Sequence, residues 1–271
     1  MKLSIITCTL NSEKYLEECI NSVINQNLDI GVYEHIFVDW DSKDKTKDIV
    51  EKYIKDYSNV KIIKRKPKWV YNAMNEGIKE AKWKYIMCLN SDDYLVEGVL
   101  DKYLGFVEKT GNKDLYYGIL NIVNNWVVKK WIEKFFRIKQ FLFKNFWCNV
   151  LIFHPTCLVK RESLLEMQLF DEDKKIASDY WMRLKMLKSG KEICYYPNNI
   201  SNFREWCNSL TTSNNKLAKE EVFYYQYKYF WFWGVLIAEI LNLFLKCYWK
   251  ITKILWKIIY NYKLTIWNHE K

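Results

Sequence analysis

Residues 85–95 read YIMCLNSDDYL, a short apolar run followed by Asn, Ser and two adjacent acids, Asp92 and Asp93. The polar residues before the run and its short length favour a buried strand of an α/β protein, whose carboxyl end is where such sheets bind ligands. Adjacent carboxylates repel each other, so such a pair is usually solvated in a turn or held by a cation. The stretch therefore predicts a divalent metal site, with an ordinary Asp-Asp turn as the alternative.

Strands and helices alternate on the N-terminal side of this run. The hydrophobic periodicity predicts strands at 3–7, 35–38, 60–63 and 85–89. It predicts three helices, one at 11–25, one that includes 49–54 and one at 71–81. This order argues for parallel β-α units in a Rossmann-like half of about a hundred residues. The segment TCTLNSEKYL after the first strand contains no glycine, which argues against a Gly-rich phosphate loop. A bound nucleotide would then have to be held by carboxylates and a metal ion.

Composition sets the broad class of protein. The 271 residues are 50% hydrophobic and 27% charged, which suits one large globular domain with an appendage. The eight cysteines include no Cys-x-x-Cys pair, so neither a zinc ribbon nor a disulfide framework is indicated, and a reducing compartment is expected. The start MKLSIITCTLNS lacks the pattern of a signal peptide. We therefore expect a cytoplasmic location.

The net charge of +10 is concentrated in two aromatic-rich segments. Residues 124–149 contain six basic residues and one acid, and residues 216–271 contain nine lysines and four glutamates, so each segment carries +5. In the second segment the lysines at 246, 250, 253 and 257 form one helical stripe flanked by aromatic residues. Interfacial membrane helices have this construction. Basic and aromatic residues also suit nucleic acids, so a basic nucleic-acid-binding protein with a degenerate α/β core is the alternative class.

The most hydrophobic stretch is FWFWGVLIAEILNLFLKCY at 230–248, which is nearly long enough to span a bilayer. Glu239 and Asn242 near its middle would be costly in hydrocarbon, so we expect a helix that lies in the plane of the membrane or is re-entrant. A true span, and packing on the catalytic domain or in a homo-oligomer, are the alternatives. The polar stretch NSLTTSNNK at 208–216 predicts a boundary between a domain at 1–212 and a helical C-terminal region at 213–271.

Four stretches in order resemble glycosyltransferase family 2. They are SIITCTLNSEKYLEECINSVINQ from residue 4, FVDWDSKDKT from residue 37, YNAMNEGIKEAKWKYIMCLNSDD from residue 71 and FDEDKKIASDYWMRLK from residue 170. The resemblance spans about 1–212 and is strongest to bacterial enzymes of polysaccharide or lipopolysaccharide synthesis. It implies a GT-A fold, a Rossmann-like mixed sheet flanked by helices. We expect this fold to carry the membrane-associating C-terminal extension.

The resemblance also implies roles for individual acids. Asp39, assisted by Asp41, takes the place of the acid that contacts the base or ribose of a nucleotide-sugar. Asp93 takes the place of a ligand to Mg2+ or Mn2+ that bridges the donor diphosphate, with Asp92 near the ribose or the metal. Asp179 takes the place of the general base that deprotonates the acceptor hydroxyl, which inverts the anomeric carbon. A helix cap is the alternative reading of Asp179.

Four further residues are candidates for donor binding: Thr7, Asn11, Asn72 and His154. The sequence departs from the family pattern near two candidates, because Trp40 and Asp41 stand where a small residue is usual and Asn72 stands where Asp is usual. For His154, beside Pro155, a packed loop position is the alternative.

Together these features predict an inverting, metal-dependent glycosyltransferase. It would move one sugar from a nucleotide-sugar to a saccharide acceptor, expected to be lipid-linked, while peripheral on the inner face of the cell membrane. No nucleic-acid partner is expected. A processive synthase is not favoured, because the Q-x-x-R-W pattern is absent and FREW at 203–206 matches it only in part.

Overall fold

The computed structural model describes residues 2–66, 69–124, 127–128, 152–204, 214, 216–225, 227–228 and 243. The chain divides into two compact units, one of Met1–Phe136 with Ile152–Tyr225 and one of Arg137–Leu151 with Gln226–Lys271. The first unit thus continues past the predicted boundary at 212. The description below concerns this first unit.

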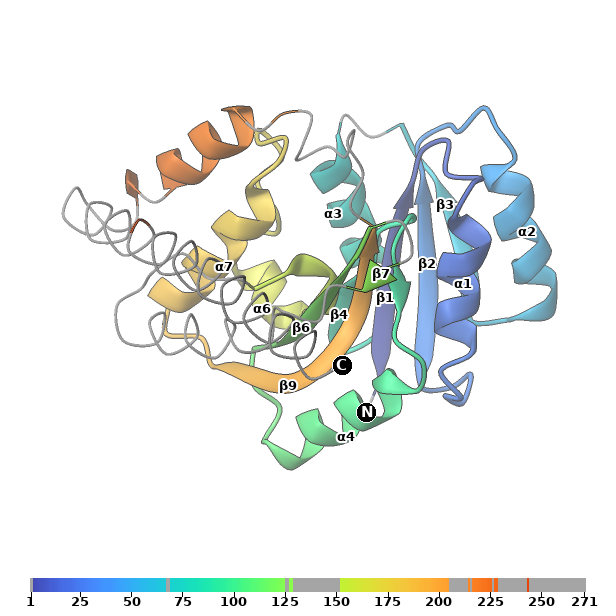
Figure 1. Ribbon diagram of the computed structural model, residues 1–271, viewed down its shortest axis with the longest axis horizontal. Coiled ribbons are helices and arrows are strands. Elements are labelled where there is room, and N and C mark those ends of the chain that lie inside the picture. Colours follow the sequence, from blue (N-terminus) through green and yellow to red (C-terminus); the bar gives the residue numbers. More distant parts are fainter. Residues whose placement is uncertain are drawn as a thin grey trace, which may run out of the picture. The chain divides into compact units, whose positions relative to one another are not determined.

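One mixed sheet organises the first unit (Figure 1), with strand order β3-β2-β1-β4-β8-β6-β9-β5 and β7 paired with β6. The strands β1 to β4 are parallel, as predicted. Antiparallel β8 lies between β4 and β6, and β9 is parallel to β6 and antiparallel to β5. The bounds are β1 Leu3–Thr9, β2 Tyr33–Asp39, β3 Val60–Lys64, β4 Tyr85–Cys88, β5 Tyr94–Leu95, β6 Leu115–Asn124, β7 Val127–Val128, β8 Leu158–Lys160 and β9 Ile193–Arg204.

Amphipathic helices cover the sheet. They are α1 Leu16–Ile24, α2 Thr46–Asp56, α3 Val70–Glu80, α4 Val99–Lys109, α6 Arg161–Glu166 and α7 Ser178–Lys188, with a 3-10 turn η1 at His154–Thr156 and a helix at 216–225. Helix α1 begins later than the predicted start at residue 11. The reason is that Asn11 has a positive φ of 49° and residues 13–15 form a turn, so this segment is a loop.

Close packing fixes α3 against the parallel half of the sheet. A Cβ atom at Gly77 would lie 2.6 Å from Cγ2 of Ile6, so a side chain there would push α3 away from β1. On the other half, the rings of Tyr103 and Tyr196 stack with centroids 4.8 Å apart, which joins α4 to β9. The first contact fixes α3, which carries Asn72, and the second fixes α4 against the strand that ends at Arg204.

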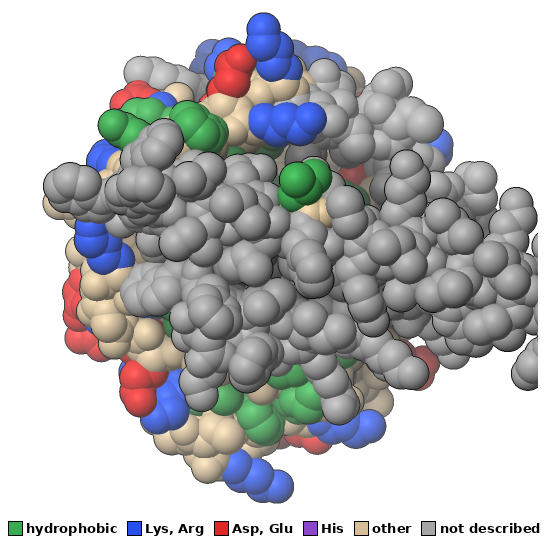
Figure 2. Space-filling model, turned by 60° about the vertical axis from the view of Figure 1, so that its left-hand side comes forward, with side chains coloured by type: hydrophobic (Ala, Val, Ile, Leu, Met, Phe, Trp, Pro, Cys, Tyr) green, Lys and Arg blue, Asp and Glu red, His purple; other side chains and the backbone are tan. Residues whose placement is uncertain are grey.

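The predicted membrane-associating segments at 124–149 and 230–248 lie almost wholly outside the described residues. Within the described part of the chain, no helix is long and apolar enough to cross a bilayer. The described side chains on the face in Figure 2 include both basic and acidic residues.

Candidate active site

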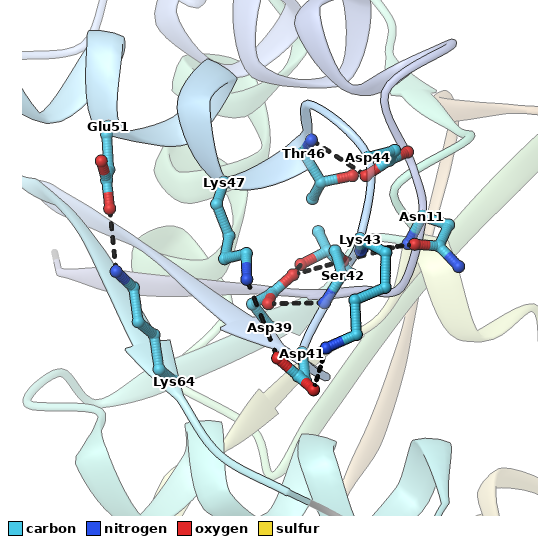
Figure 3. Close-up of polar contacts among 11 residues, drawn as sticks. Asn11, Asp39, Asp41, Ser42, Lys43, Asp44, Thr46, Lys47, Glu51 and Lys64 are labelled. Carbon is cyan, nitrogen blue, oxygen red and sulfur yellow. Dashed lines mark hydrogen bonds and ion pairs between the residues drawn. The ribbon is translucent and has the colours of Figure 1, made fainter.

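Three loops meet at the carboxyl ends of β1, β2 and β4, and hydrogen bonds tie them together. The backbone N–H of Asn11 donates to Oγ of Ser42 at 3.0 Å, and Oδ1 of Asn11 accepts from the N–H of Lys43 at 2.9 Å (Figure 3). The N–H of Ser12 donates to Oγ1 of Thr46 at 2.7 Å, and its hydroxyl lies 2.9 Å from that of Ser91. Asn11, predicted to bind the donor, thus joins two of these loops.

Asp39 lies at the end of β2, as predicted, and is only 1% exposed. Its carboxylate accepts bonds from Oγ1 of Thr9 at 3.1 Å, the N–H of Ser42 at 3.1 Å and the hydroxyl of Ser42 at 2.5 Å. A carboxylate offers about four acceptor sites, so one remains for a ligand. Asp39 therefore shapes the loop after β2 in addition to any contact with a nucleotide.

Asp41 points in a different direction from Asp39 (Figure 3). Its backbone is left-handed, with φ 59°, and its half-exposed carboxylate pairs with Lys43 at 2.5 Å and Lys47 at 3.8 Å. The hydrogen bond from Lys43 lowers the pKa of Asp41. The structure therefore gives Asp41 two lysine partners at the surface.

The ring of Trp40 lies beside that of Trp69, with centroids 6.4 Å apart. The Nε1 atom of Trp40 is buried and has no hydrogen-bond partner among the described residues. Trp40, which departs from the family pattern, thus joins the loop after β2 to the segment before α3.

Thr7 lies inside the sheet. Its side chain is fully buried, and its Oγ1 is 2.9 Å from Nε2 of His35, whose pKa burial lowers to about 3. The role of Thr7 in donor binding stays a prediction. Thr9, which pairs in register with Asp39 and donates to it, is a second candidate on the same strand.

The two acids that follow β4 differ in exposure. Asp93 is fully buried, and its carboxylate accepts from the N–H of Arg204 at 3.0 Å and from Nδ2 of Asn90 at 2.7 Å. Burial, reinforced by the charge of Asp92, raises the pKa of Asp93 to about 8. Burial also raises the pKa of Asp92, whose side chain is partly exposed. The structure therefore favours Asp92 for the cation contact that the sequence analysis assigned to Asp93.

Arg204, at the end of β9, holds the acid pair in place and was not predicted as a site residue. Its guanidinium carbon lies 4.7 Å from the ring centre of Tyr15 and 4.6 Å from that of Tyr94. Its Nη1 donates to the carbonyl of Asp92, and its Nη2 pairs with the carboxylate of Glu18. The only sequence signal was the arginine of FREW.

Asp179 lies in the first turn of α7. The N-cap of this helix is Ala177, so Asp179 is not the capping residue. Its carboxylate, 21% exposed, accepts from Nη1 of Arg183 at 2.7 Å and from the hydroxyl of Tyr71 at 3.1 Å. Burial opposes ionisation, but the charge and hydrogen bond of Arg183, together with His154 and the backbone N–H of Tyr180, outweigh it, and the pKa of Asp179 falls below its usual value. The acid is therefore ionised at neutral pH, as a general base must be.

His154 lies near Asp179 and is a neutral imidazole. Burial lowers its pKa to about 4, although the charge of Asp179 opposes this shift. Its Nε2 is buried without a hydrogen-bond partner among the described residues, and its ring packs edge-on against Phe170 with centroids 5.4 Å apart. His154 thus lies close to the candidate base, and it is also packed against a neighbouring ring, as the alternative interpretation expected.

Asn72 binds the loop that precedes α7. Its Nδ2 donates to Oε2 of Glu172 at 2.7 Å, while Asn75 donates to Oε1 of the same residue at 2.8 Å. The candidates therefore fall into two groups. One lies in the loops after β1, β2 and β4, and the other surrounds Asp179. Trp69 connects them, because its ring lies beside Trp40 and its Nε1 donates to the carbonyl of Lys175 at 2.7 Å.

Within 2–66, 69–124, 152–204 and the few described residues after them, no group of three His, Cys, Asp or Glu side chains forms a preassembled metal cluster. The donor set instead offers one partly exposed carboxylate beside a buried one. This set fits Mg2+ or Mn2+ bound together with a diphosphate, because such ions keep several oxygen ligands from water or substrate and take only one or two carboxylates from the protein.

Comparison with known proteins identifies the family. The family model described as Glycosyl transferase family 2 matches residues 4–167, and the chain belongs to this family. The resemblance recognised in the sequence is therefore confirmed.

Individual relatives agree with this assignment. A poly(ribitol-phosphate) beta-glucosyltransferase of Bacillus spizizenii is 36% identical over 136 residues, a match that covers 48% of this chain and 21% of the relative. The S. aureus TarS 1-349 structure in complex with UDP-GlcNAc superposes with a TM-score of 0.67 at 22% identity, covering 83% of this chain and 64% of the other. The mannosyltransferase PcManGT from Pyrobaculum calidifontis, in complex with GDP-Man and Mn2+, gives 0.65 at 14% identity, covering 82% and 61%. These two likenesses confirm the GT-A type of mixed sheet flanked by helices.

Proposed function

We propose that this chain is an inverting, metal-dependent glycosyltransferase that moves one sugar from a nucleotide-sugar to a saccharide acceptor. The observation that carries the proposal is the separation of two kinds of carboxylate. Asp179 is held ionised by Arg183 at the start of α7, whereas Asp92 and Asp93 lie in the loop after β4. Inverting transfer needs both, one carboxylate for the acceptor and a separate group at the leaving diphosphate.

Asp92 would hold the Mg2+ or Mn2+ ion, with Asp93 behind it. A divalent ion, when bound, removes the repulsion between the two acids and neutralises charge on the leaving diphosphate. Asp39 and Thr9 would contact the nucleoside, with Trp40 and Trp69 as neighbouring aromatic surfaces. The mannosyltransferase complex with GDP-Man and Mn2+ supports this choice of donor and metal by its similar fold.

Asp179 would remove the proton from the acceptor hydroxyl. The hydroxyl of Tyr71 and the guanidinium of Arg183 each bind one of its oxygens and thereby fix the carboxylate's orientation. Fixing a reacting group in this way removes part of the entropic barrier to attack. The acceptor oxygen would then attack the anomeric carbon from the face opposite the leaving nucleotide.

The acceptor class that we favour is a cell-surface glycopolymer or its lipid-linked precursor. The poly(ribitol-phosphate) beta-glucosyltransferase relative supports a polymer acceptor by its name. The two segments that each carry +5 support docking at the inner face of the membrane.

Reversing Lys246, Lys250, Lys253 and Lys257 to Glu should release the protein from anionic vesicles at low salt while donor hydrolysis persists. Unchanged vesicle binding would contradict the docking proposal.

The central experiment compares Asp179→Asn with the wild type. We expect loss of transfer by a factor of about 10² to 10⁴, the usual contribution of a general base, with unchanged stabilisation by nucleotide-sugars in the presence of Mn2+. Asp173→Asn is the matched control, because this acid is exposed in the loop before α7. A wild-type rate in Asp179→Asn would refute the assignment. Salt-dependent DNA binding without any nucleotide-sugar response would instead favour the alternative class.

A further inference from the structure

The loop at 171–177, which leads into α7, is bound by a carboxylate from the helix at 216–225. Glu221 accepts from the backbone N–H groups of three successive residues, Lys175 at 3.0 Å, Ile176 at 2.9 Å and Ala177 at 2.9 Å. The Glu221 side chain is 7% exposed. Consecutive N–H groups at the start of a helix favour an anion, since they and the helix dipole carry partial positive charge. Glu221 thus supplies an internal anion at the N-terminus of α7.

The carbonyl groups of the same loop are bound from the opposite direction by side chains of the α3 region. Nε1 of Trp69 donates to the carbonyl of Lys175 at 2.7 Å, and the hydroxyl of Tyr71 donates to that of Ile176 at 2.5 Å. The Tyr71 hydroxyl also reaches Asp179. Both edges of the loop's backbone are therefore fixed just before Asp179.

A second bond attaches the same helix to the beginning of the loop. The hydroxyl of Tyr225 donates to Oδ2 of Asp171 at 2.7 Å, and the fully buried Tyr225 ring lies 6.1 Å from that of Trp181 in α7. The helix therefore contacts the loop at both ends and α7 itself. Although these residues follow the predicted domain boundary at 212, they belong to the same compact unit as the candidate active site.

We propose that Glu221 is a positioning residue for Asp179. It neutralises the helix N-terminus and holds residues 175–177 so that the carboxylate two positions later faces the acceptor. The inference rests on the proposed role of Asp179 as the base. Displacing a catalytic group by about 1 Å can lower a rate about 10²-fold, so a fixed loop has a measurable consequence.

The test compares Glu221→Ala and Glu221→Gln with Glu220→Ala, a control at the neighbouring exposed position. We expect Glu221→Ala to lower kcat at least tenfold, with donor Kd by calorimetry changed less than twofold. Glu221→Gln keeps one acceptor oxygen and should restore part of the rate. Glu220→Ala should behave as wild type. Thermal unfolding checks that the variants fold. If Glu221→Ala does not fold, the kcat and donor Kd of Glu221→Gln are compared with those of the wild type instead.

A double-mutant cycle separates positioning from general structural damage. In an Asp179→Asn background, measured by single turnover over long times, Glu221→Ala should lower the residual rate no further, because residues that act as a unit are not additive. If the rate losses of Glu221→Ala and Asp179→Asn are additive, the positioning role is wrong and the proposed function stands. The same holds if both Glu221 variants have wild-type kcat while Asp179→Asn is inactive. Full activity of Asp179→Asn would overturn the proposed function together with this inference.

Discussion

Replacing Arg204 should destabilise the protein more than any surface arginine, because its buried guanidinium makes several contacts at once. The two ring contacts contribute about 0.5–2 kcal/mol each, and the charge-assisted bond to the carbonyl of Asp92 about 1.5–3 kcal/mol. The pair with the 41% exposed Glu18 adds little, about 0–1 kcal/mol. Since Met would refill part of the space between the rings, we expect Arg204→Met to lower the unfolding free energy by about 3 kcal/mol.

The same variant should weaken metal binding. Without the guanidinium the carbonyl of Asp92 loses its donor, while the backbone N–H at position 204 still reaches Asp93. Mn2+ titration in the presence of a nucleoside diphosphate should therefore give a larger Kd for Arg204→Met. Arg204→Lys, which keeps the charge but not the planar fork, should fall between Arg204→Met and wild type.

Urea unfolding followed by tryptophan fluorescence measures the stability change, and Arg65→Met is the control. Arg65 is exposed, and its ion pairs among the described residues are with Glu76 and Glu80 at the surface, so its loss should change the unfolding free energy by less than about 1 kcal/mol. If Arg204→Met unfolds within about 1 kcal/mol of the wild type and binds Mn2+ normally, the reasoning about this residue is wrong.

Three other changes test the site. Arg183→Met removes the main group that opposes the effect of burial on Asp179, so the pKa of Asp179 should rise and the acidic limb of the pH–rate profile should move toward neutral; an unmoved limb would contradict this. Thr9→Val removes a donor to Asp39 and should weaken nucleotide-sugar binding in calorimetry, whereas Thr7→Val should alter stability alone; equal effects would argue against Thr9. Because only ionised Asp93 attracts a cation, Mn2+ affinity should rise as pH passes about 8, and Asp93→Asn should flatten this dependence.

The parallel half of the sheet could be predicted because its signals are local. The strand predicted at 35–38 is β2 at Tyr33–Asp39, and the helix predicted at 71–81 is α3 at Val70–Glu80. The half that contains β5 to β9, where parallel and antiparallel pairings are mixed, could not be predicted, because β9 is defined by partners distant in sequence. Its sequence ICYYPNNISNFR contains a proline and lacks regular alternation, and its pairing with β6 is irregular between Tyr117 and Ile119.

The candidate site was predictable to a similar extent. Acids at the ends of parallel strands had to converge at one sheet edge, which located Asp39 and the acid pair. Which acid of the pair faces outward depends on the N–H of Arg204, a residue distant in sequence. Glu221 binds a loop more than forty residues earlier and lies outside the stretch that resembles the family, so no local pattern pointed to it.

The position of β9 between β6 and β5 has a consequence for biosynthesis. As the chain leaves the ribosome, β6 is complete well before β9 is made, and among the described strands its other neighbours in the sheet are the short strands β8 and β7. During that interval the backbone of Leu115–Asn124 presents an uncovered edge of the kind that pairs with foreign strands. We therefore expect the nascent protein to be more prone to aggregation until β9 covers this edge. The same late strand delivers Arg204 to Asp93, so the acid pair reaches its final geometry when this edge is covered.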